Sequence, residues 1–161
     1  MGAGQGKANF GYLPGVVDIS EVRTVTDEVV EGIAALVPQL SSSAVAPDKA
    51  AVTEMVDSPA VRLLVARDGA DGPIVGTLTL AVFRIPTGVR AWIEDVIVDA
   101  AAERRGIGEA LSRSALGLAG EAGARTVELT SRPARQAANR LYQRIGFERR
   151  DTNVYRYRLA D

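Results

Sequence analysis

Apolar residues recur along the chain at two spacings, one typical of strands and one typical of helices. β-branched and alternating segments predict strands at 16–26, 61–67, 74–85, 89–98 and 125–130. Helical spacing predicts helices at 26–37, 47–56, 106–122 and 134–145. Turn residues separate the strands at 61–67, 74–85 and 89–98, so these three are expected to form an antiparallel meander.

Glycine and proline mark where the predicted helices end. Pro38, followed by SSSAVAPD, is expected to break the first helix. Gly123 and Gly146 are expected to end the last two helices, since glycine suits the left-handed conformation after a helix. Two further strands, at 147–150 and 154–159, are predicted to form a terminal hairpin.

No repeat or linker divides the pattern. The economical interpretation is a flexible leader over residues 1–15, followed by one mixed α/β domain over residues 16–161. A chain of 161 residues with 47% apolar residues is long enough to build one substantial core.

The charge and the residues that are missing restrict the chemistry. A net charge of −1 gives no global reason to expect nucleic acid or a membrane as a partner. The chain begins without a signal peptide and has no apolar run near the ~20 residues that span a bilayer, so we expect a cytoplasmic protein. Cysteine and histidine are both absent, which excludes disulfides, thiolate catalysis and histidine-dependent triads. We expect no metal site, and acid–base chemistry is left to Asp, Glu, Tyr, Lys or water.

The sharpest motif is EDVIVDAAAERRGIGEAL, residues 94–111, in which a strand leads through a short loop into a helix. Glycines at a helix start let a ligand approach the free N–H groups there, and the helix dipole favours an anion such as phosphate. Arg104 and Arg105 add positive charge. A Gly-x-Gly pair also occurs as a plain turn. It is not a dinucleotide-binding fingerprint here, because Leu111 stands where the third glycine belongs.

This segment resembles the acetyl-CoA motif of the GNAT superfamily, Arg/Gln-x-x-Gly-x-Gly/Ala. A second block, Ala138-Asn139-Arg140-Leu141-Tyr142-Gln143-Arg144-Ile145-Gly146-Phe147, is similar to that family's closing A-x-x-LY-x-x-x-GF pattern. The resemblance covers roughly residues 61–159. It implies a central, mostly antiparallel sheet that is splayed between its two central strands and flanked by helices.

The resemblance also implies an acetyl-CoA site. The strand before the loop would bind the pantetheine arm through backbone groups of Val96, Ile97 and Val98. The pyrophosphate would lie on the backbone amides of the loop and first helical turn, which are Arg104, Arg105, Gly106, Ile107, Gly108 and Glu109. One position departs from the family pattern, because Glu103 stands where Arg or Gln is usual, and Arg104 or Arg105 would substitute for it. Arg135 and Asn139, on the last helix, are further candidates for cofactor contact; Arg135 could equally be a solvated charge.

Two side chains are candidates for catalysis. Tyr142 matches the tyrosine that protonates the departing CoA thiolate in many family members, although such a tyrosine also suits an amphipathic helix core. Glu94 is the candidate base for the amine, against the alternative of a solvated strand carboxylate. Asp95 should point to the opposite face and make structural hydrogen bonds. Trp92 shares the face of Glu94, where it would line the acceptor pocket or simply be core.

The resulting hypothesis is an N-acetyltransferase that moves an acetyl group from acetyl-CoA to a primary amine by direct attack in a ternary complex. The acceptor, a small molecule or a peptide, is not fixed by the sequence. The alternative is a non-catalytic acyl-CoA sensor or regulatory module of the same fold, which would not need Glu94 or Tyr142. A nucleic-acid-binding module ranks last, with balanced charge and 5% aromatic residues. A homodimer is common in the resembled family.

Overall fold

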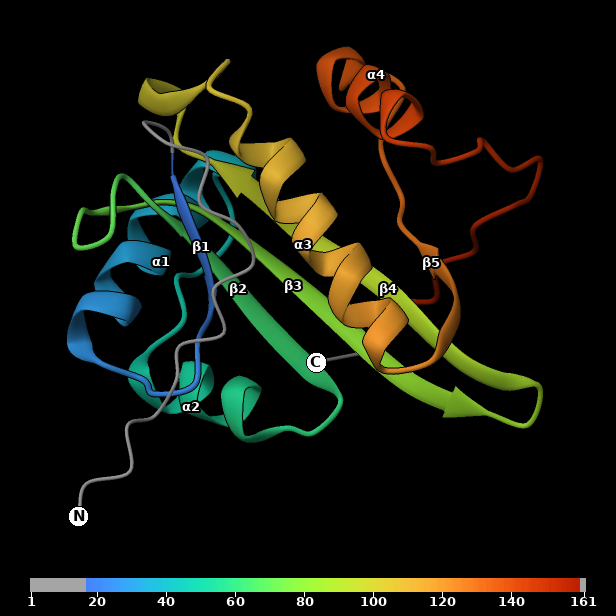
Figure 1. Ribbon diagram of the computed structural model, residues 1–161, viewed down its shortest axis with the longest axis horizontal. Helices are drawn as coiled ribbons and strands as arrows, with labels where there is room; N and C mark the ends of the chain where they lie inside the picture. The colour runs from blue at the N-terminus through green and yellow to red at the C-terminus, as the bar shows by residue number, and fades with distance from the viewer. Residues whose placement is uncertain (1–16, 160–161) are drawn as a thin grey trace. The chain divides into compact units, whose positions relative to one another are not determined.

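The computed structural model describes residues 17–159 of the chain, and the leader expected at residues 1–15 lies outside them (Figure 1). The described residues fall into two compact units. The N-terminal unit comprises residues 17–130, and the C-terminal unit comprises residues 131–159.

The N-terminal unit is built on a five-stranded sheet in the order β1-β2-β3-β4-β5. Neighbours are antiparallel from β1 to β4, and β4 pairs with β5 in parallel. The predicted meander is therefore confirmed, and so is the mostly antiparallel sheet. The strands are β1 Asp18–Glu21, β2 Val61–Arg67, β3 Ile74–Ile85, β4 Gly88–Val98 and β5 Ala124–Glu128.

The first strand is much shorter than the predicted 16–26. β1 pairs with only four residues of β2, and a last backbone bond joins the N–H of Val22 to the carbonyl of Leu63. Beyond that point the chain turns toward the first helix, where the Thr26 side chain accepts a hydrogen bond from the N–H of Val29. Residues 23–26, of which all but Arg23 are β-branched, thus follow the strand pattern without having a strand partner among the described residues.

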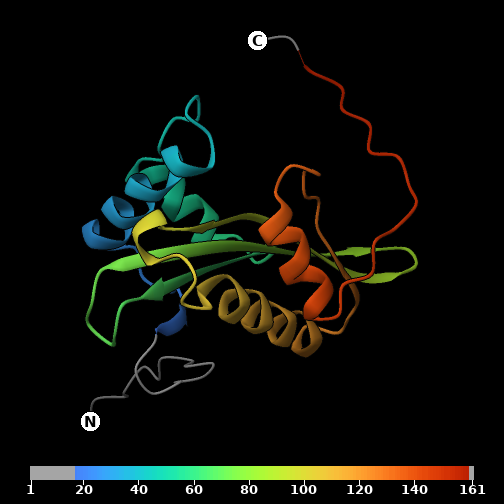
Figure 2. The same ribbon diagram turned by 90° about the horizontal axis from the view of Figure 1, so that it is seen from above.

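Helices cover both faces of the sheet in this unit (Figure 2). α1 (Asp27–Leu40) and α2 (Lys49–Asp57) lie on one face, and α3 (Ile107–Glu121) lies on the other. Asp48 begins α2 by accepting from the N–H of Ala51, as its position near the predicted helix start suggested. The α/β class and the alternation of helices with strands are as the sequence predicted.

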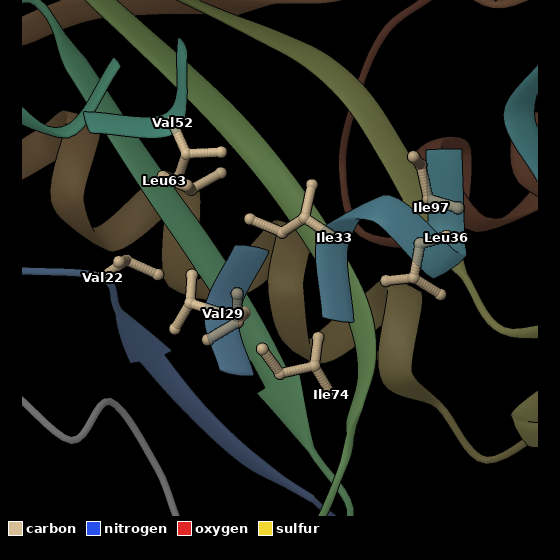
Figure 3. Packing of buried hydrophobic residues seen from close by; sticks show 9 residues of the cluster. Val22, Val29, Ile33, Leu36, Val52, Leu63, Ile74 and Ile97 are labelled. Carbon is tan, nitrogen blue, oxygen red and sulfur yellow. The ribbon is translucent and has the colours of Figure 1, made fainter. Parts of the chain in front are cut away.

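The core between the sheet and its first two helices is aliphatic (Figure 3). It collects side chains from the sheet and from both helices, which are Val22, Val29, Ile33, Leu36, Val52, Leu63, Val65, Ile74 and Ile97. Val52 and Leu36 are almost completely buried, which fixes both helices against the sheet.

The prediction that Pro38 ends the first helix was wrong. Pro38 lies inside the last turn of α1, which continues to Leu40 before Ser41 caps it. A proline so close to the end removes a single intrahelical N–H, the one that would reach Ala34. Val37 and Leu40 pack against the core cluster, and that contact holds the last turn in place.

β4 changes partners along its length. Its first half pairs with β3 on one side and with β5 on the other, through Val89, Ala91 and Trp92. From residue 93 to residue 98, β4 is paired only with β3 within the N-terminal unit. This separation of β4 from β5 is the expected splay, and it leaves a free strand edge directly before the glycine loop.

The C-terminal unit contains one helix, α4 (Gln136–Arg144). Gly146, with φ of 105°, ends it, and the N–H of Phe147 donates to the carbonyl of Tyr142 at 2.9 Å. The predicted terminal hairpin is absent, since residues 147–159 form no strand. Their alternating pattern satisfies strand propensity, but an isolated two-stranded hairpin is marginal in water without further packing. Tyr155, Tyr157 and Leu159 are accordingly exposed.

Candidate active site

A bulge interrupts β4 opposite Leu78. Thr77 pairs with Ile97 and Thr79 pairs with Glu94, so two residues of β4 oppose one residue of β3. Asp95, one of the two, has φ of 48°, a left-handed conformation that is unusual for a residue other than glycine. Because of the extra residue, side chains after the bulge point to the opposite face from the one that regular alternation would give them.

The reversal places two buried isoleucines on opposite faces. Ile93 and Ile97 are four residues apart and would share a face in a regular strand. Instead Ile97 joins the α1–α2 core, whereas Ile93 pairs with Leu80 on the face toward α3. Simple alternation therefore fails at Asp95, contrary to the expectation that Glu94 and Asp95 point to opposite faces of a regular strand. Within residues 17–159 the Asp95 side chain makes no hydrogen bond, so its expected structural bonds are not found.

Of the β4 residues predicted to bind the pantetheine arm, Val96 lies in this bulge, and Ile97 and Val98 follow it. Ile97 is buried in the core and can offer a ligand only its backbone, while Val96 and Val98 are half-buried. The N–H of Asp99 donates to Val75 of β3 at 2.9 Å. Because backbone groups alternate along a strand, those of Val98 point away from β3, toward the free edge of the N-terminal unit.

The loop after β4 carries a row of backbone amides that have no acceptor within residues 17–159. A short 3-10 turn (Ala100–Ala102) leads to Arg104 and Gly106, with φ of 66° and 75°, and α3 begins at Ile107 without a side-chain cap. Among the described residues, no acceptor is found for the amides of Arg104, Gly106, Ile107 and Gly108. A helix start of this kind attracts anions through its N–H groups and its dipole.

Gly76, near the start of β3, allows α3 to approach the sheet. A Cβ atom on Gly76 would lie 3.0 Å from Cγ2 of Ile107 and 3.2 Å from Cδ1 of Leu111. Both side chains are buried. A glycine inside a strand is the one signal in the sequence that could have revealed this close approach.

The positive charges of the loop are not equivalent. Arg105 binds Asp68, in the turn between β2 and β3, with two bonds: Nη1 to Oδ2 at 3.0 Å and Nη2 to Oδ1 at 2.6 Å. The hydrogen bonds from Arg105 lower the pKa of the Asp68 carboxyl. The side chain of Arg104 is exposed and makes no ion pair within residues 17–159, and Glu103 is also exposed. Arg104 is therefore the arginine that is available to an anion, and Asp68 is a residue that the sequence interpretation missed.

Glu94 lies on the opposite face of the sheet from α3, together with Trp92. The indole Nε1–H of Trp92 donates to Oε1 of Glu94 at 2.8 Å. Trp92 is half-buried and Glu94 is exposed, so the indole is neither a plain core residue nor fully solvated. The predicted sharing of one face by these two residues is confirmed.

The other predicted site residues belong to the C-terminal unit. Burial raises the pKa of the Tyr142 phenol, and the nearby charge of Arg135 opposes that rise. The Tyr142 ring meets Phe147 edge-on, with 5.7 Å between the ring centroids. Asn139 donates from Nδ2 to the carbonyl of Arg132 at 3.0 Å, which ties α4 to the segment before it.

The N-terminal unit thus brings together the β4 edge, the amide row and Glu94, whereas Tyr142, Arg135 and Asn139 are grouped in the C-terminal unit. No group of acidic side chains suited to a metal ion occurs among residues 17–159. None of the helices in that part of the chain is long and apolar enough to cross a membrane.

The chain matches a family model and several solved structures. Residues 35–147, more than half of the chain, match the model of the acetyltransferase (GNAT) family. The search of curated proteins gave no match. Among solved structures, the aminoglycoside acetyltransferase meta-AAC0020 from an uncultured soil metagenomic sample, in complex with trehalose, is 20% identical with a TM-score of 0.78, over 92% of this chain and 99% of that one.

Two further structures extend the comparison. AAC(6')-Iy, in complex with the bisubstrate analog CoA-S-monomethyl-acetylneamine, is 20% identical with a TM-score of 0.70, over 89% of this chain and 99% of that one. A transcriptional regulator from Bacillus halodurans C-125 is 28% identical with a TM-score of 0.70, over 88% of this chain and 99% of that one. The match to the family model, with a fold shared by these structures, shows that the chain belongs to the GNAT acetyltransferase family.

Proposed function

We propose that the chain transfers the acetyl group of acetyl-CoA to a primary amine by direct attack within a ternary complex. The observation that carries the proposal is the row of backbone amides at the start of α3, next in the chain to the free edge of β4. These two features offer hydrogen-bond donors to a pyrophosphate and a strand edge to an extended amide chain, and CoA contains both groups.

The loop suits the pyrophosphate for reasons of geometry and charge. The backbone is left-handed at Arg104 and Gly106, the amides of the row have no acceptor among the described residues, and the helix dipole adds partial positive charge. A Cβ atom on Gly106 would meet no protein atom within 4 Å, so the space over the loop is open to a ligand. Glu103 stands where the family pattern has Arg or Gln, and the exposed side chain of Arg104 supplies a full positive charge in its place.

The transfer itself needs three groups. The amine nitrogen forms a bond to the thioester carbon while the carbon–sulfur bond breaks, and a backbone N–H near Val96 polarises the carbonyl. Glu94, directly or through water, takes the proton that the ammonium loses. Tyr142, which burial keeps protonated at neutral pH by raising its pKa, donates its phenolic proton to the departing thiolate. The second proton, which the nitrogen loses on becoming an amide, restores the phenol. No covalent intermediate is required, which is consistent with a chain that contains neither cysteine nor histidine.

Calorimetry with acetyl-CoA and CoA tests the binding step. Gly106→Val places a β-branched side chain on backbone with φ of 75° and covers the amide row, so we expect at least a tenfold loss of affinity. Gly117→Ala is the matched control, because Gly117 lies within α3 with no neighbour within 4 Å of its Cβ position and should bind normally. If the intact protein bound neither acetyl-CoA nor CoA, the proposal would be wrong.

A second candidate is a non-catalytic acyl-CoA sensor of the same fold. It is favoured by the name of the transcriptional regulator that shares 28% identity with the chain. The two candidates differ in turnover: a sensor would bind acetyl-CoA without releasing CoA in the presence of any amine. Release of CoA that depends on an added amine, together with its loss in Glu94→Gln, would decide for the enzyme.

A further inference from the structure

One polar contact on the face opposite α3 is not used by the proposed chemistry so far. Trp92 and Glu94 are two residues apart on β4, and the indole Nε1–H donates to Oε1 of Glu94 at 2.8 Å. Glu94 makes no other hydrogen bond or ion pair within residues 17–159. An exposed glutamate normally samples several rotamers, and this bond selects one of them.

The strand register defines what surrounds the pair. Thr79 of β3 lies opposite Glu94, and Ala81 lies opposite Trp92. On the other side of β4, Glu128 of β5 pairs with Trp92. Both neighbours on β3 are small, so the indole and the carboxylate project beyond them. Glu128 is a second carboxylate beside the indole, but it has no hydrogen bond to it.

The chemistry of the two groups makes the contact asymmetric. An indole has one hydrogen-bond donor and no acceptor, so the bond to Glu94 uses its whole capacity. A carboxylate has two oxygens and accepts several hydrogen bonds, so Oε2 remains available. The pair therefore presents one oxygen of a fixed carboxylate at the edge of an aromatic ring, and this negative charge attracts an ammonium group.

We propose that Trp92 is the positioning residue for Glu94: it holds Oε1 so that Oε2 is aimed at the acceptor amine. The inference rests on the proposed function for its catalytic meaning. Fixing a base in its working geometry raises the turnover rate, and a displacement of about 1 Å can cost about 10²-fold. Trp92 acts through Glu94 and has no proton of its own to transfer to the substrate.

The pair can be tested without turnover, because Trp92 is the single tryptophan of the chain. Its fluorescence should change in one step when an acid titration protonates the bonded carboxylate, while circular dichroism confirms that the protein stays folded. We expect Glu94→Gln to remove this step and Glu128→Gln to retain it. A step that survives in Glu94→Gln and is lost in Glu128→Gln would overturn the inference, and so would emission that shows no step in the intact protein.

Kinetics then test the consequence for catalysis. Trp92→Phe removes the N–H and keeps an aromatic ring, and we expect kcat to fall about tenfold with the KM for acetyl-CoA unchanged. In the Glu94→Gln background the same change should have little further effect, because both variants break one unit. Equal losses in the two backgrounds would show that Trp92 does not act through Glu94.

The two proposals fail in different ways. If no amine supports acetyl transfer but the fluorescence step depends on Glu94, the proposed function fails and the positioning of Glu94 by Trp92 stands. If acetyl transfer occurs and Trp92→Phe keeps the kcat of the intact protein, the proposed function stands and the positioning role is wrong.

Discussion

Replacing Gly76 by alanine should loosen the contact between α3 and the sheet. The added Cβ would lie 3.0 Å from Cγ2 of Ile107, 3.2 Å from the carbonyl oxygen of Ile97 and 3.2 Å from Cδ1 of Leu111. None of these atoms can yield easily, since the oxygen belongs to a paired strand and both side chains are buried.

The expected size follows from two opposing effects. Overpacking of a core contact costs about 1–3 kcal/mol. Replacing glycine by alanine also removes freedom from the unfolded chain, which returns about 0.4–1 kcal/mol. We therefore expect Gly76→Ala to lower the free energy of unfolding by about 1–2 kcal/mol. Because Ile107 begins α3, the same displacement should weaken CoA binding.

Urea unfolding followed by circular dichroism measures the first effect, with the m-value as a check that the unfolded state is unchanged. The control is Gly117→Ala in the exposed part of α3, which should stabilise the protein by about 0.5–1 kcal/mol. If Gly76→Ala were as stable as this control, α3 would not pack on β3 as closely as described, and the account of the loop position would be refuted.

Three further changes test other parts of the structure. In urea unfolding, Asp68→Asn should lower the free energy of unfolding at neutral pH but not at acidic pH, because Arg105 lowers the pKa of Asp68. The stabilisation by the Asp68 carboxylate is present above its unfolded-state pKa of about 4 and is lost as the pH falls through the lowered, folded-state pKa. Asp48→Ala should cost about 1 kcal/mol in the same assay, since it removes the cap of α2, and equal stability would argue against that cap. Tyr142→Phe should lower kcat about 10²-fold and remove a tyrosinate absorbance step above pH ~10, whereas a step below that pH would contradict the raised pKa.

Much of the fold could be predicted from the sequence because its signals are local. Turn residues bound the strands of the meander, and the structure places β2 and β3 at 61–67 and 74–85, where the pattern predicted them. Gly123 and Gly146 take the left-handed conformation that ends a helix. The glycine loop was recognisable because its chemistry depends on the backbone, and glycines mark it directly.

The features that were missed depend on distant partners. The bulge at Asp95 is set by the register of β4 against β3, and residues 94–96 contain no sequence signal that predicts it. Pro38 was expected to end the first helix. The helix continues to Leu40 because Leu40 packs against the core. The terminal hairpin failed for the opposite reason, since residues 147–159 have the right alternation but no ladder of backbone partners.

In the candidate site too, some features follow from local sequence signals and others from contacts between distant residues. The choice of Glu94 as the candidate base followed from the resemblance, whereas its hydrogen bond to Trp92 depends on the conformations of two side chains, which the sequence pattern does not specify. Arg105 was a candidate for phosphate binding by charge alone, and the structure shows it engaged by Asp68, 37 residues earlier in the chain. Charge patterns locate candidate cations, whereas tertiary contacts decide which of them remain available.

We propose that the amides at the start of α3 bind the pyrophosphate of CoA. The most direct test is a heteronuclear NMR titration of the 15N-labelled protein with CoA, following the backbone amides of Arg104, Gly106, Ile107 and Gly108. We predict that these four signals shift most strongly, together with those at the free edge of β4, and that pantetheine, which lacks the pyrophosphate, leaves the loop signals unchanged. Saturable binding that shifts other amides and leaves these four in place would contradict the account.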